Sequence, residues 1–152
     1  MTPIGRLAQF LRSAGVDAQL EGETVMLNFD ESEVARGEVY LELEESGSHW
    51  RVQGEAAMSL LVGEEALGEV LMGLNLINSS LPVGSLYLEA LSDEENPFDE
   101  GVAFTLWGRF SALVASLEPE DLTLLQETLE EFLGGVSEAL EGSMDMRQTL
   151  KA

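Results

Sequence analysis

The sequence predicts an α+β protein, in which helices pack on an antiparallel sheet of about five strands in the order α-β-β-β-α-β-β-α. Three stretches repeat apolar residues at helical spacing, and five others alternate apolar with polar residues. Turn-forming residues separate these stretches. With 152 residues and 45% hydrophobic content, the chain is long enough to bury a core. We therefore predict one domain over residues 1–141, followed by a flexible tail over 142–152.

The first helix is predicted to begin at Thr2-Pro3, a cap followed by a first-turn proline, and to end at Gly15. Its apolar face consists of Ile4, Leu7, Phe10 and Leu11. A strand over 24–29 follows, and a brief strand over 16–20 is an option that would raise the strand count by one.

A hairpin is predicted next, because residues 38–44 alternate cleanly and Ser46-Gly47-Ser48 is a turn signal. The return strand places Trp50 and Val52 inward. Arg51 points outward, where we expect it opposite a glutamate of the previous strand.

The stretch Glu64–Asn78 predicts the central helix of the fold. Its two opening glutamates favour a helix N-terminus. Its apolar stripe consists of Ala66, Leu67, Val70, Leu71, Leu74 and Ile77. Met72 and Leu76 fall outside this stripe, so the helix is apolar around more of its girth than one packing face requires. We therefore expect a homodimer with Met72 and Leu76 in or near the interface; the outer face of the sheet is the rival interface.

The second half of the chain predicts two strands and a long helix. The strands are expected over 85–91 and 101–110, with 111–117 either continuing the second strand or turning. In the second strand the inward residues are Val102, Phe104, Leu106 and Phe110. The last helix starts at Pro119, and Gly134-Gly135 predicts a bend or a tight approach in it. Its apolar stripe consists of Leu122, Leu125, Leu129, Phe132, Leu133, Val136 and Leu140.

The charge is strongly negative: 29 acidic residues face 7 basic ones, for a formal net charge of −22. Such a chain is repelled by nucleic acid and by anionic membranes, so we expect direct contact with neither. Basic proteins would be attracted, including nucleic-acid-binding proteins whose basic surface an acidic protein could occupy. Solubility alone is the alternative explanation of the charge.

The sequence shows no catalytic constellation. It has no cysteine and a single histidine, His49, and it lacks a nucleophile elbow and a phosphate-binding glycine loop. We therefore expect no enzyme, no catalytic residue, no cofactor and no metal site. The first ten residues lack the apolar core of a signal peptide, which favours a cytoplasmic protein.

The acidic loop over residues 92–100 supports an alternative function. Asp93, Glu94, Glu95, Asp99 and Glu100 supply the hard oxygen ligands that calcium prefers, although their spacing departs from the EF-hand pattern. A regulator that responds to a small ligand or cation through this loop is therefore the alternative to a protein-binding module.

The outward side of the predicted sheet is unusually apolar. Large side chains take the outward phase of their strands at Met26, Tyr40, Tyr87, Leu91 and Trp107. If their strands are neighbours, these residues form a patch ringed by glutamates, and exposed patches mark interaction surfaces. A dimer partner or a terminal helix of the same chain would be an alternative cover.

Three stretches, GLNLINSSLPVGSLYLEA, GVAFTLWGRF and LEPEDLTLLQETLEEFLGGVSEAL, together with the element order, resemble the bacterial YbjN-like proteins, proposed to be sensory transduction regulators. The resemblance covers about residues 1–141 in element order and 66–141 in residue pattern. It implies the fold of type III secretion chaperones and a small acidic homodimer that binds protein segments without catalysis. Glu118 departs from the pattern, because a Ser or Thr helix cap is usual there, and so does the long acidic loop.

Overall fold

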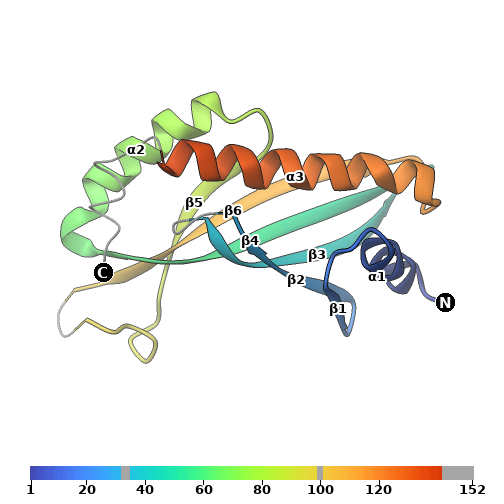
Figure 1. The fold of residues 1–152 in the computed structure, drawn as a ribbon. Helices are drawn as coiled ribbons and strands as arrows, with labels where there is room; N and C mark the ends of the chain where they lie inside the picture. Colours follow the sequence, from blue (N-terminus) through green and yellow to red (C-terminus); the bar gives the residue numbers. More distant parts are fainter. Residues whose placement is uncertain (32–34, 99–100, 142–152) are drawn as a thin grey trace.

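The computed structural model describes residues 1–31, 35–98 and 101–141 (Figure 1). This part of the chain contains three α-helices, a short 3-10 turn and one six-stranded antiparallel sheet in the order β1-β2-β3-β4-β6-β5. The elements are α1 (Pro3–Ser13), β1 (Ala18–Glu21), β2 (Thr24–Asp30), β3 (Arg36–Ser46), β4 (His49–Gly63), η1 (Glu64–Ala66), α2 (Leu67–Ser80), β5 (Ser85–Ala90), β6 (Ala103–Val114) and α3 (Pro119–Glu141).

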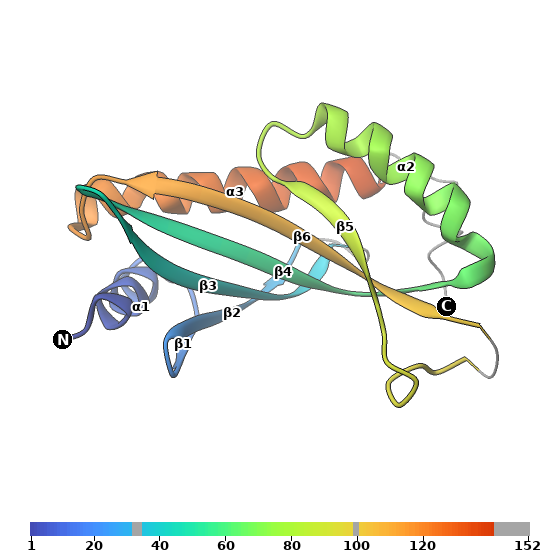
Figure 2. The ribbon, with the colours of Figure 1, turned by 180° about the vertical axis from the view of Figure 1, so that it is seen from behind.

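The predicted α+β class is confirmed, and the sixth strand is the optional one near residues 16–20. Helix α3 runs along one face of the sheet, α1 lies at the β1 end of that face, and α2 lies at the opposite end beside β5 (Figures 1 and 2). Within the described residues the other face carries no helix, and we call it the helix-free face. The core lies between the sheet and its helices, on the side to which Val25, Val39, Leu41, Val52 and Leu106 point.

Helix α1 forms as the sequence predicts. The Thr2 hydroxyl accepts a hydrogen bond from the Gly5 N–H at 3.1 Å, which caps the helix. Leu7 and Leu11 are fully buried. In the last turn of the helix, Arg12 Nε donates to the Ala18 carbonyl at 2.7 Å. This bond holds the end of α1 against β1.

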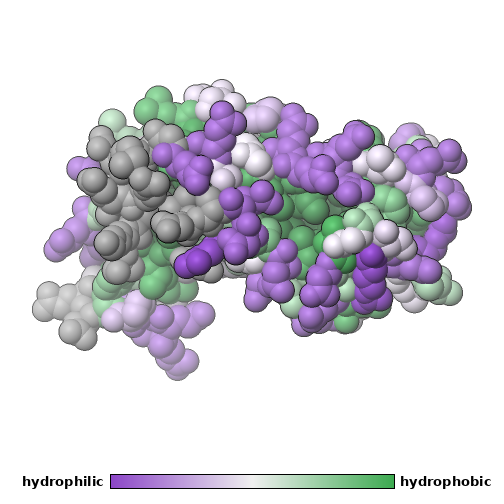
Figure 3. Space-filling view, viewed as in Figure 1, coloured by the Kyte–Doolittle hydropathy of each residue, from purple (hydrophilic) through white to green (hydrophobic). Residues whose placement is uncertain are grey.

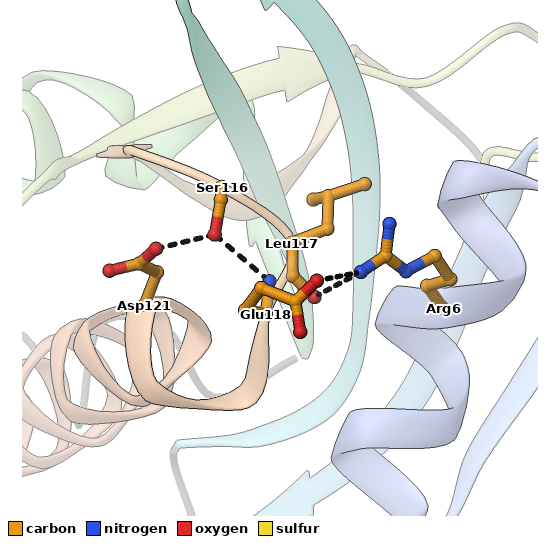
Figure 4. A network of polar contacts seen from close by, with 5 residues as sticks. All are labelled: Arg6, Ser116, Leu117, Glu118 and Asp121. Atoms are coloured by element: carbon orange, nitrogen blue, oxygen red, sulfur yellow. Dashed lines mark hydrogen bonds and ion pairs between the residues drawn. The ribbon is translucent and has the colours of Figure 1, made fainter.

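The start of α3 is organised by Ser116 (Figure 4). Its Oγ accepts a hydrogen bond from the Glu118 N–H at 3.1 Å and donates to the Asp121 carboxylate. Glu118 forms an exposed ion pair with Arg6 of α1 at 2.9 Å, and Arg6 also donates to the Leu117 carbonyl at 3.4 Å. The capping role missing at Glu118 is therefore taken by a serine two residues earlier.

Helix α3 packs on the sheet through the Phe132 ring, which lies beside Gly108 of β6. The Phe132 ring lies 4.9 Å from the Phe110 ring, measured between centroids. A Cβ added to Gly108 of β6 would lie only 2.6 Å from Phe132 Cζ, so the glycine gives the ring its place on the strand. All seven residues of the predicted apolar stripe are buried. The helix continues through Gly134-Gly135. A Cβ on Gly134 would meet no heavy atom within 4 Å, whereas one on Gly135 would lie 3.6 Å from Leu81 and from Pro82.

Four expectations need correction. The central helix is α3 rather than α2, which covers only one end of the sheet. Leu71 of α2 is accordingly 49% exposed instead of covering the sheet. Strand β4 extends to Gly63, well beyond the part of the return strand that the alternation of Trp50 and Val52 indicates, and its register with β6 shifts between Ala57 and Leu61. Val102 precedes β6 and is 40% exposed, so its predicted inward position is wrong.

The hairpin prediction is confirmed. Residues Ser46 and His49 pair across a two-residue turn in which Gly47 has a φ of 64°. Arg51 lies directly opposite Glu44, as the alternation predicts. None of the described helices is long and apolar enough to cross a membrane.

Candidate protein-binding surfaces

The helix-free face places the predicted patch residues in two pairs. Met26 of β2 lies directly opposite Tyr40 of β3, and Tyr87 of β5 lies directly opposite Trp107 of β6. Strand β4 separates the pairs, so they do not form the continuous patch that neighbouring strands would give. The fifth residue, Leu91, follows β5, is half-buried, and donates its N–H to the Ala103 carbonyl at 2.8 Å.

The second pair belongs to a four-residue cluster. The Tyr87 and Trp107 rings are stacked, with centroids 6.5 Å apart and planes at 20°. The Arg109 guanidinium lies 4.6 Å from the Tyr87 centroid, which is a cation–π distance. Trp107 Nε1 donates to Thr105 Oγ1 at 2.9 Å. The sequence analysis missed the contact of Arg109 with Tyr87, although the period-two spacing of residues 105, 107 and 109 gives their side chains one face.

Tyr40 is held by its own strand. Its hydroxyl donates to the Glu38 carboxylate two residues earlier. This hydrogen bond, followed by burial and by the negative charges of Glu38 and Glu21, raises the pKa of Tyr40 from 10.0 to about 12. The phenol therefore remains a neutral donor over the physiological pH range.

A hollow of about 650 Å³ lies on the sheet between the two pairs. Its charged lining residues are Glu42, Arg51, Glu55 and Arg109, so carboxylates and guanidiniums balance. Of the predicted patch residues only Tyr40 lines it. In the described part of the chain neither arginine forms an ion pair, which leaves both guanidiniums able to bind a carboxylate or a backbone carbonyl.

Helix α2 exposes large apolar side chains to solvent. Met72 is 72% and Leu76 is 71% exposed, and Leu71, which directly precedes Met72, is 49% exposed. The buried side of the helix consists of Val70, Leu74 and Ile77. The exposure of Met72 and Leu76 confirms that they lie outside the packing stripe. We call Leu71, Met72 and Leu76 the α2 patch.

The acidic loop is held by local hydrogen bonds. Ser92 Oγ donates to Glu95 at 2.9 Å, Asn96 Nδ2 donates to the Gly101 carbonyl at 2.9 Å, and the Phe98 N–H donates to Asn96 Oδ1 at 2.8 Å. Across residues 1–31, 35–98 and 101–141, no three His, Cys, Asp or Glu side chains gather to hold a metal ion. Two acids of the proposed cation loop, Asp99 and Glu100, lie outside the described residues.

Comparison with known proteins places this chain by fold. No family model matches the sequence, and no curated protein matches it. The crystal structure of YbjN from E. coli, proposed to be a transcription regulator, matches with a TM-score of 0.53 over 91% of each chain at 16% sequence identity. The chain therefore has a YbjN-like α+β fold, as the resemblance in the sequence implies. At this identity the match speaks for the fold alone.

Proposed function

We propose that this protein is a non-catalytic protein-binding module, chaperone-like or regulatory, that acts as a homodimer. The α2 patch is the observation that carries the proposal, because Met72 and Leu76 keep about seven-tenths of their surface in water. Burial of a side chain of this size contributes about 1.5–3 kcal/mol. Apolar surface gathered on one helix is typical of an interaction site.

A second copy of the chain is the occupant that suits the α2 patch. Two copies, each with a net charge of −22, repel one another least where the contact itself is uncharged. Glu69 is the single charged residue among the fourteen of α2. A twofold contact would bring Met72 and Leu76 of both copies together without placing many acidic side chains of one copy opposite those of the other.

The helix-free face supports binding of a protein partner. It offers the pair of Met26 and Tyr40 and the stacked pair of Tyr87 and Trp107, with Leu91 at the end of β5. Glutamates surround these side chains on β3, β4 and β5. Aromatic rings amid carboxylates suit lysine and arginine side chains, which pair with the acids and stack on the rings. We therefore infer a basic protein partner. A nucleic-acid-binding protein is one class with a suitably basic surface.

Affinity capture from cell extract tests this function. The immobilised wild type and a Tyr87→Ala, Trp107→Ala variant are compared at about 0.05 M and about 0.3 M salt, because charge attraction weakens with screening. We expect a protein that the wild type retains at low salt and that the double variant retains less. If neither salt gives a protein above the empty matrix, the proposal is wrong.

A further inference from the structure

The helix-bearing side of the molecule contains a hollow that lies apart from the α2 patch and from the helix-free face. It lies between the middle of α3 and the second half of β2, where Figure 3 shows hydrophobic side chains bordered by hydrophilic ones. Its volume is about 310 Å³, at the lower end of the range for ligand pockets, roughly 300–1,000 Å³. Its apolar lining consists of Val16, Leu27, Phe29, Leu129 and Leu133.

The topology explains why this place stays open. The β1 ladder ends where Ala18 pairs with Leu27, so among the described residues no strand lies beside 28–30 on that side of β2. Helix α1 has already ended at Ser13, and the chain turns at Gly15, whose φ is 88°. The second half of β2 therefore faces α3 across the hollow, and no second helix lies beside α3 there among the described residues.

The rim of the hollow is acidic. Asp30 and Glu31 line it from the end of β2, and Glu130 lines it from α3, whereas no lysine or arginine among the described residues lines it. Arg36 pairs with Asp30 across the sheet, but it is not part of the lining and forms no ion pair with Asp30 within the described residues. Helix α3 contains no basic residue at all, so its charge adds to that of the rim.

We propose that this hollow receives one bulky apolar side chain from a basic peptide segment of the partner, with flanking lysines or arginines paired to Asp30, Glu31 and Glu130. The inference rests on the proposed protein-binding function and assigns a place to one part of the partner. The apolar lining recognises the side chain by burial, and the three carboxylates select cationic neighbours over acidic ones.

The test uses a fluorescent probe peptide, acetyl-Gly-Lys-Lys-Phe-Lys-Lys-Gly-amide, and a matched peptide with glycine in place of phenylalanine. Anisotropy is measured with the full-length protein. Both peptides carry four lysines, so their non-specific charge attraction is equal, and about 0.15 M salt weakens it. We expect the phenylalanine peptide to bind at least about tenfold more tightly, as burial of one such ring predicts. Equal affinities would overturn the proposal, because the charge alone would then explain binding.

A variant that fills the hollow locates the binding site. Val16 is half-buried at the lining, so Val16→Phe adds a ring there without replacing a core side chain. It should weaken the phenylalanine peptide about tenfold and leave the glycine peptide unchanged. The control is Val102→Phe, which adds the same ring at an exposed position outside the hollow. Equal effects of the two variants would contradict the assignment.

Two charge-matched variants separate this inference from the proposed function. The rim variant neutralises the three rim carboxylates by the substitutions Asp30→Asn, Glu31→Gln and Glu130→Gln. The control variant neutralises three exposed acids of the helix-free face by the substitutions Glu42→Gln, Glu44→Gln and Glu89→Gln. We expect about a fivefold loss for the rim variant and less than about twofold for the control. A loss confined to the helix-free-face variant would overturn the hollow as the site while leaving the proposed function in place.

The chain itself supplies a competing occupant. Residues 142–152 include the basic residues Arg147 and Lys151 together with the large apolar residues Met144, Met146 and Leu150. If the wild type fails to bind the phenylalanine peptide and the Arg147→Gln, Lys151→Gln variant binds it, the hollow is filled by this segment of the chain. That result would replace the partner as occupant.

Discussion

The side-chain amide of Asn78, near the end of α2, forms two hydrogen bonds with the backbone of Leu86 in β5. Asn78 Nδ2 donates to the Leu86 carbonyl at 2.9 Å, and the Leu86 N–H donates to Asn78 Oδ1 at 2.7 Å. Because β5 is an edge strand, these backbone groups need a partner from outside the sheet. The amide supplies a donor and an acceptor together, as a neighbouring strand would. It also joins the helix that bears the α2 patch to the sheet.

Removing this amide should destabilise the protein. Asn78→Ala leaves a part-buried N–H and C=O of Leu86 without their partner, and we expect a loss of about 1–3 kcal/mol in the free energy of unfolding. Asn78→Asp keeps the acceptor and should fall between wild type and Asn78→Ala. Urea denaturation provides the measurement, with exposed Asn75→Ala as the control on the same helix. Equal losses for the two alanine variants would show that the bonds contribute nothing.

Substitution by alanine should change the stability of the protein in opposite directions at Gly108, which lies beside Phe132, and at Gly134 within α3. A Cβ at Gly108 would lie 2.6 Å from the Phe132 ring, so we expect Gly108→Ala to cost about 1–3 kcal/mol through displacement of the ring. Gly134 has no heavy atom within 4 Å of such a Cβ, and Gly134→Ala should stabilise the helix by about 0.5–1 kcal/mol. Thermal denaturation of both variants decides this. A stabilised Gly108→Ala would mean that Phe132 packs elsewhere.

Light scattering tests the homodimer. We expect the wild type at twice the monomer mass of 16.5 kDa and a Met72→Glu, Leu76→Glu variant at the monomer mass, because four acids would meet across the twofold axis. The control is Leu113→Glu, Leu124→Glu, which adds the same charge at two side chains that are each 51% exposed on β6 and α3. A wild-type monomer rules out the dimer, and dissociation of the control alone moves the interface away from α2.

The pH dependence of Tyr40 follows from its bond to Glu38. The pKa of Tyr40 is raised from 10.0 to about 12, so the folded state holds the phenol proton more tightly than the unfolded state does. This stabilisation is fully present below about pH 10 and is lost as the pH rises through about 12. Ultraviolet titration of phenolate in a Tyr87→Phe variant should give a midpoint near 12. Adding Glu38→Gln should lower that midpoint, and an unchanged midpoint would remove Glu38 as the cause.

Local patterns were sufficient for most elements because their signals lie within a few residues. The Thr2-Pro3 start of α1, the turn at Gly47 and the seven-residue stripe of α3 all depend on neighbours along the chain. The exposure of Met72 and Leu76 was predictable for the same reason, since helical periodicity separates them from Val70, Leu74 and Ile77.

Other features depended on which strands became neighbours. Period-two alternation shows that Met26, Tyr40, Tyr87 and Trp107 point outward, but it carries no information on strand order. The order β3-β4-β6-β5 divides them into two pairs and brings Arg109 over Tyr87. The substitute cap at Ser116 was missed because the usual pattern places the cap next to the helix, at Glu118.

The sequence by itself determined the α+β class, the faces of α1 and α3, the charge and the apolar excess of α2, because each follows from composition or from periodicity along one segment. Only the tertiary structure decided that α3 crosses the sheet and that a hollow remains between α3 and β2. Those features depend on how far β1 extends along β2 and on the packing of the Phe132 ring beside Gly108. Such contacts join residues distant in sequence, and no local pattern encodes them.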